Sequence, residues 1–177
     1  MKKVLILAIA AAIVMLMPSF VSAQTASGTL TVTATVQGSI GLVFNSDAAG
    51  VALTGSGTNA ATLAFGNVSA FGALSAGVTR PSVTATNFTV SSAVDVQVTK
   101  TNSASANYTL KAQLGAADAV NTWAVGGVAV TSAAQSTLTA TGTYAANSNF
   151  PVAITIPFTT ASGTAISNTI NYTATAN

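Results

Sequence analysis

The residues that most often perform catalysis or bind metals are scarce in this sequence. Its 177 residues include no His and no Cys, and only three are acidic. The three are Asp47, Asp95 and Asp118. Without His or Cys, the usual nucleophilic triads and zinc sites cannot be built. A carboxylate pair for glycoside hydrolysis would have to come from these widely separated Asp residues. We therefore expect no enzyme, and no catalytic, cofactor-binding or metal-ligating residues.

Two residues could still contact a ligand, but both have more ordinary explanations. Asp47 lies in a loop rich in Ser, Asn and Gly that lacks the alternating acidic pattern of a calcium loop. A turn-forming Asp is the favoured interpretation. Trp123, beside Gly126 and Gly127, could stack on a sugar. A large aromatic side chain in a short apolar run is more often a core anchor, so we predict that Trp123 is buried.

Residues 1–23 have the features of a secretory signal peptide. Lys2 and Lys3 precede an apolar run over residues 4–17, and Val21-Ser22-Ala23 suits signal peptidase. The run is shorter than the ~20 residues that a membrane-spanning helix needs. The sequence therefore predicts cleavage after Ala23, no membrane span in the mature chain, and a secreted protein in the periplasm or at the cell surface.

The mature chain is expected to be electrically neutral. Lys2 and Lys3 leave with the signal peptide, and Arg80, Lys100 and Lys111 then balance the three Asp residues (3 − 3 = 0). No basic patch remains, so we expect no nucleic-acid partner. A neutral surface repels its copies weakly, which favours self-association. Because the chain has no Cys, packing and backbone pairing, and no disulfide, must stabilise it.

Alternation of apolar and hydroxyl side chains dominates the sequence after the signal peptide. Leu30, Val32, Ala34 and Val36 would lie on one face, with Thr residues on the other, which predicts an N-terminal strand over residues 24–37. The same alternation predicts further strands over residues 40–44, 63–66, 82–90, 93–99, 108–114, 122–125, 128–131, 136–144, 152–158 and 166–176.

The spacing of these runs predicts the fold class. Many short strands separated by turn residues, without a sustained helical period, are typical of an all-β protein. We expect a single antiparallel, immunoglobulin-like β-sandwich over residues 38–177. The Gly126-Gly127 pair predicts a tight hairpin, because both positions can adopt positive φ.

Three segments resemble the archaic chaperone-usher pilins and the related spore coat protein U family. Residues 25–36 are similar to the alternating segment that precedes an incomplete sandwich in that group, and residues 63–68 to its short strand with a Phe-Gly pair. The aligned Ile170, Tyr172 and Ala174 resemble its final strand, which carries a near-terminal aromatic residue. The disulfide common in the group is absent here.

The resemblance implies assembly by β-strand donation. The N-terminal segment of one subunit would fill a groove in the next, with Leu30, Val32, Ala34 and Val36 entering its pockets. A periplasmic chaperone and an outer-membrane usher are the implied partners. The predicted function is an exported structural subunit of a surface fibre or coat. The sequence leaves open a monomeric extracellular adhesion or glycan-binding domain, in which the same strand folds back into its own sheet.

Overall fold

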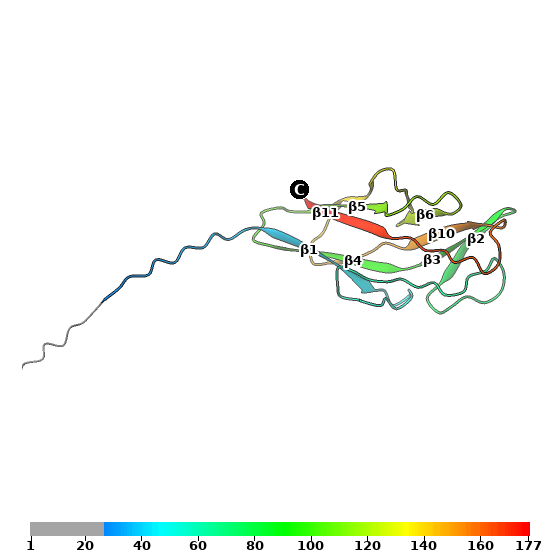
Figure 1. The fold of residues 1–177 in the computed structure, drawn as a ribbon, viewed down its shortest axis with the longest axis horizontal. Coiled ribbons are helices and arrows are strands. Elements are labelled where there is room, and N and C mark those ends of the chain that lie inside the picture. Colours follow the sequence, from blue (N-terminus) through cyan, green and yellow to red (C-terminus); the bar gives the residue numbers. More distant parts are fainter. Residues whose placement is uncertain (1–26) are drawn as a thin grey trace, which may run out of the picture. The chain divides into compact units, whose positions relative to one another are not determined.

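The computed structural model describes residues 27–177, and the predicted signal peptide lies outside them. The described residues form eleven β-strands and no helix, and all strand pairs are antiparallel (Figure 1). The prediction of an all-β antiparallel sandwich is confirmed, and the immunoglobulin-like strand order stays a prediction. The strands are β1 (Ser39–Ser46), β2 (Thr79–Val83), β3 (Asn87–Ser92), β4 (Val94–Thr101), β5 (Tyr108–Leu114), β6 (Thr122–Val125), β7 (Val128–Val130), β8 (Ser136–Gly142), β9 (Asn147–Asn149), β10 (Val152–Pro157) and β11 (Ile170–Ala176).

Two layers of strands enclose the core of the domain. The first layer contains the sheets β2-β3-β10-β6-β7 and β1-β4-β9, and the second is the sheet β11-β5-β8. Only Ala93 separates β3 from β4, so this stretch of chain passes from one sheet of the first layer into the other. Side chains of β4 and β5 pack together between the layers.

The buried faces of the strands follow the predicted alternation. Val94, Val96 and Val98 of β4 are buried, and so is every second residue of β5 from Tyr108 to Leu114. Trp123 is also buried, as predicted. The Gly126-Gly127 hairpin between β6 and β7 is confirmed, with both φ angles positive. No helix within residues 27–177 is long and apolar enough to cross a membrane.

Four parts of the sandwich differ from the predicted strands. Residues 166–169 of the strand predicted over residues 166–176 form no strand, so β11 begins at Ile170. Residues 82–90 are divided between β2 and β3, because the Thr84 hydroxyl accepts hydrogen bonds from the backbone N–H groups of Thr86 and Asn87 and so forms a turn. Residues 63–66 form no strand, although Leu63 and Phe65 pack against the core. The short β9 was not predicted, because Asn and Ser rarely favour strands.

The predicted N-terminal strand is not formed in the single chain. Residues 27–38 contain no strand, and residues 24–26 lie outside the described part. The exposed fractions of Leu30, Val32 and Val36 are 86%, 81% and 74%. A strand is stable only when neighbouring strands pair with its backbone groups, and no pairing involves these residues. The compact unit of the chain begins at Val36.

Candidate functional site: a groove between β1 and β11

An open groove with a volume of about 1660 Å³ lies between β1 and β11. Its first wall consists of β1 and residues 59–68, and its second wall of residues 162–172. Buried core side chains form the floor. They are Leu53, from the connection between β1 and β2, and Val90, Val94, Trp123, Val152, Ile154 and Ile156 from strands of the first layer. The groove therefore opens directly onto the hydrophobic core.

The edge of β1 that faces away from β4 has unpaired backbone groups. The backbone N–H of Phe44 donates to the Thr58 carbonyl at 2.8 Å, and its carbonyl accepts from the Gly57 N–H at 2.7 Å. Both groups of Phe44 thus point away from β4. Backbone groups of alternate residues in a strand point the same way, so those of Ile40 and Leu42 also point to this edge. They have no backbone partner there among the described residues.

The edge of β11 that faces away from β5 is unpaired in the same manner. The Thr169 carbonyl accepts from the Gly115 N–H, and the Asn177 N–H donates to the Asn107 carbonyl, so odd-numbered residues here face β5. Backbone groups of Ile170, Tyr172 and Ala174 therefore face away from β5. No strand within the described residues pairs with them. The groove is consequently bordered by the free edge of β11 and by the part of the β1 edge at Ile40 and Leu42 that is free.

Two aromatic rings meet between the walls of the groove. The centroids of Phe44 on β1 and Tyr172 on β11 lie 5.0 Å apart, with the ring planes at 69°. Burial raises the pKa of the Tyr172 hydroxyl, which therefore stays neutral throughout the physiological range. No Asp, Lys or Arg lines the groove. An uncharged, apolar, extended segment is the ligand that this surface fits.

The predicted site residues fall into two groups. Ile170 and Tyr172 line the groove, and Ala174 packs against the neighbouring core cluster. The side chains of Leu30, Val32, Ala34 and Val36 are exposed. No strand within the described residues pairs with these four positions, so their role stays a prediction.

Sequence reasoning missed the first wall of the groove. Leu42 and Phe44 alternate as expected for a strand, but the alternation does not reveal that one edge of β1 stays unpaired. Within residues 59–68, the sequence predicts a strand only over residues 63–66. Alternate apolar side chains of this stretch, Ala61, Leu63 and Phe65, are half-buried and pack against the core, whereas Thr62 and Ala64 are exposed. This alternation, with a period of two, is the sequence signal that could have identified residues 59–68 as a wall of the groove.

The Asp residues have structural roles. The Asp47 carboxylate accepts from the Ala49 N–H at 2.7 Å, which confirms a turn-forming residue. Asp118 organises the loop after β5. Desolvation raises the pKa of its carboxyl group, but hydrogen bonds from the backbone of Asn121, the Trp123 indole, the Asn121 side chain and the backbone of Val120 outweigh it and lower the pKa to about 2. Within residues 27–177, no cluster of three or more acidic residues could hold a metal ion.

No family model, curated protein or solved structure matches this chain. The function must therefore be inferred from the groove and from the chemistry of the residues that precede it.

Proposed function

We propose that the protein is an exported structural subunit of a surface fibre or coat, assembled by β-strand donation between copies. Residues 29–36 of one copy would add a strand between β1 and β11 of the next. The groove is the observation that carries this proposal, because it leaves two strand edges unpaired above an apolar floor. Export depends on the predicted signal peptide, and a periplasmic chaperone and an usher are the expected partners.

The N-terminal segment is complementary to the groove in three respects. Its apolar side chains are exposed in the single chain, and burial of Leu30, Val32 and Val36 would contribute roughly 1.5 to 3 kcal/mol each. Its backbone groups can pair with the free edge of β11 and with Ile40 and Leu42 of β1. Residues 27–38 carry no charge, as the groove requires.

The direction of the inserted strand separates donation between copies from closure within one chain. β1 begins and β11 ends at the same end of the domain, so the two strands run antiparallel (Figure 1). A segment that turned back through Gln37 and Gly38 onto its own β1 would run antiparallel to β1. It would therefore run parallel to β11.

A strand antiparallel to β11 can come only from another copy. In that direction Val36 lies at the end of the groove farthest from the start of its own β1. The eight residues of β1 span roughly 26 Å at about 3.3 Å per residue. The link from Val36 to Ser39 reaches only about 10 Å when fully extended. The two directions therefore correspond to the fibre subunit and to the closed monomeric domain.

Val32→Asp tests the donation itself, with Thr33→Asp as the matched control. Val32 would enter the groove, where an unpaired carboxylate costs several kcal/mol, whereas Thr33 would face outward. Unheated detergent gels should show an oligomer ladder for the parent chain and for Thr33→Asp, and only monomer for Val32→Asp. Circular dichroism should show the same folded domain in all three. A ladder formed equally well by Val32→Asp would rule out donation by this segment.

Crosslinking tests the direction, because the parent chain has no Cys of its own. Thr35→Cys combined with Ser162→Cys should be joined between copies by a short bifunctional thiol reagent, since Ser162 lines the groove at its far end. Thr29→Cys combined with Ser162→Cys should not be joined, because the donated strand places Thr29 at the opposite end of the groove. Efficient crosslinking of this second pair within one chain would instead identify the closed monomeric domain.

A further inference from the structure

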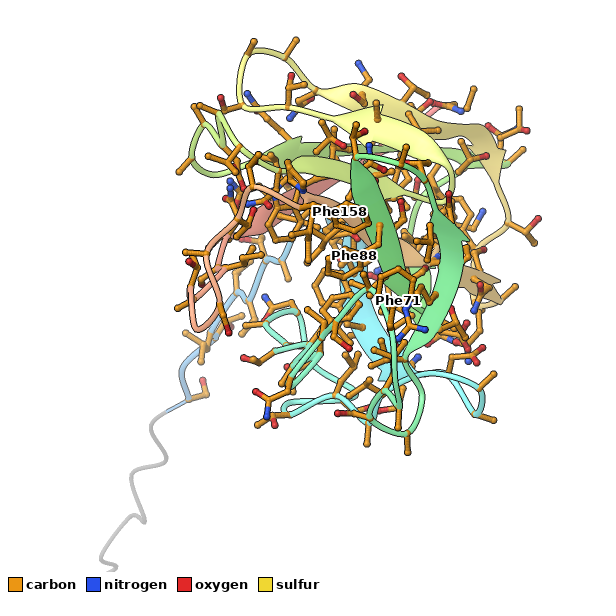
Figure 2. The ribbon with its side chains drawn as sticks, turned by 90° about the vertical axis from the view of Figure 1, so that its right-hand side faces the viewer. Phe71, Phe88 and Phe158 are labelled. Carbon is orange, nitrogen blue, oxygen red and sulfur yellow. The ribbon has the colours of Figure 1, made fainter. Side chains whose placement is uncertain are left out.

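Three phenylalanine rings gather at the end of the domain opposite the start of β1 (Figure 2). The centroids of Phe88 and Phe158 lie 6.1 Å apart with nearly parallel planes, and those of Phe71 and Phe158 lie 6.4 Å apart. Phe88 is buried, whereas Phe158 is 42% exposed and Phe71 is 74% exposed. We refer to these three rings as the aromatic patch. Exposed aromatic surface of this kind usually marks a contact with another molecule.

Arg80 holds the turn that carries Phe71, the most exposed ring of the patch. Arg80 donates from Nε to the Ser69 carbonyl and from Nη2 to the Gly72 carbonyl, each at 2.9 Å. These two bonds bracket Phe71 and fix the turn that carries it. A turn that is fixed before binding loses little conformational freedom when a partner covers it.

The aromatic patch continues from one end of the groove. Val68 and Ile156 line the groove and closely precede Phe71 and Phe158 in the sequence. Ser162 and Gly163, which follow Phe158, also line the groove. A donated strand that runs antiparallel to β11 therefore ends with Val36 beside this patch.

We propose that the aromatic patch is the surface on which the domain of the donating copy rests. The inference rests on the proposed function, since it takes strand donation as given. Between the donated Val36 and the start of β1 at Ser39 the chain reaches only about 10 Å, so the donor's own domain must lie against this end of the acceptor. The occupant is thus a second copy of the chain, and the patch covers the Gln37-Gly38 link and the first residues of the donor's β1.

Successive subunits would then be connected by two separate contacts. The groove holds the donated strand, and the aromatic patch limits the angle between successive domains. Burial of Phe71 in the oligomer is the property that distinguishes this arrangement from subunits connected by the donated strand alone.

Thiol labelling tests the inference on full-length chains. Phe71→Cys is the reporter, and Thr137→Cys, at an exposed position of β8 that pairs with Lys111 in the middle of β5, is the matched control. Each is made in the parent and in the non-assembling Val32→Asp chain. Because thiol reactivity follows access, a maleimide should label Phe71→Cys about tenfold more slowly in oligomers than in monomers, and Thr137→Cys at nearly equal rates.

Each outcome is informative about a different step. Equal labelling of Phe71→Cys in oligomer and monomer would overturn the inference while leaving strand donation intact. The patch would then remain free for another ligand, such as a glycan or an apolar surface. A parent chain that forms no ladder would refute the proposed function itself. Loss of the ladder in Phe71→Cys alone, with a folded monomer, would support the contact, and Phe158→Cys repeats the test with the second exposed ring.

Discussion

β5 and the N-terminal segment carry the same alternating pattern but have opposite environments. β5 lies between β11 and β8, and its apolar side chains are buried. The N-terminal segment has no strand partner, and its large apolar side chains are almost fully exposed. The pattern thus specifies a strand with one apolar face. It does not specify which chain supplies the neighbours.

The difference identifies what the N-terminal segment lacks. A strand needs both a paired backbone and a covered apolar face, and β5 obtains both within its own sandwich. The groove offers the same two things to a segment of matching pattern. In the proposed function, strand donation between copies would give the N-terminal segment a paired backbone and would fill the groove.

The largest contrast is expected between Leu110→Ala in β5 and Val32→Ala in the N-terminal segment. Leu110 is 0% exposed, so its truncation should lower the free energy of unfolding by about 3 to 5 kcal/mol. Val32→Ala should change it by less than about 0.5 kcal/mol, because an exposed side chain loses no packing. Urea unfolding of monomeric protein measures both. A similar loss for both variants would mean that the segment packs into its own domain.

Most of the fold was accessible from the sequence. The inward residues of β4 and β5 and the Gly-Gly hairpin follow from period two and from positive φ. The boundary between β2 and β3 was not accessible, because a Thr side chain makes that turn where Gly or Pro would normally signal one. β9 was also hidden, since it depends on pairing with β4 and on the Asn149 amide donating to Asp47 and Asp95.

The groove could be predicted from the sequence only in part. Ile170 and Tyr172 were identified through their alternation and through a family resemblance. Their position on a groove wall depends on which edge of β11 pairs with β5, and the sequence does not encode that edge locally. The contact of Phe44 with Tyr172 joins the first and last strands of the domain. Local patterns cannot reveal a contact between residues so far apart in the chain.

An intermediate effect on the free energy of unfolding is expected when a glycine of the domain and a glycine of the N-terminal segment are each replaced by Ala. Gly77 has a φ of 78°, and an added Cβ would lie 2.3 Å from the backbone of Gly50. Gly77→Ala should therefore lower the free energy of unfolding by about 2 to 3 kcal/mol, since neither backbone can give way cheaply. Gly28→Ala should leave it unchanged, because nothing lies within 4 Å of the new methyl group. Thermal unfolding of the monomers compares the two, and equal melting temperatures would contradict the close approach at Gly77.

The smallest expected effect is a pH dependence of the stability of the domain, which the assembly through the groove should not share. The pKa of Asp118 is lowered from 3.8 to about 2, so its hydrogen bonds stabilise folding above pH 3.8, and this contribution disappears as the pH falls towards 2. Asp118→Asn places an amide among the N–H donors that the carboxylate now accepts from. Because the carboxylate is well solvated, the variant should be only about 1 kcal/mol less stable at pH 6, and the difference should vanish as the pH falls through 2.

Urea midpoints measured across this pH range test the role of Asp118, and a pH-independent difference would contradict it. The groove and residues 27–38 carry no ionised group, so the oligomer ladder should instead persist unchanged from pH 4 to pH 8. A ladder that weakened within that range would show that charged groups outside the groove contribute to the interface between copies.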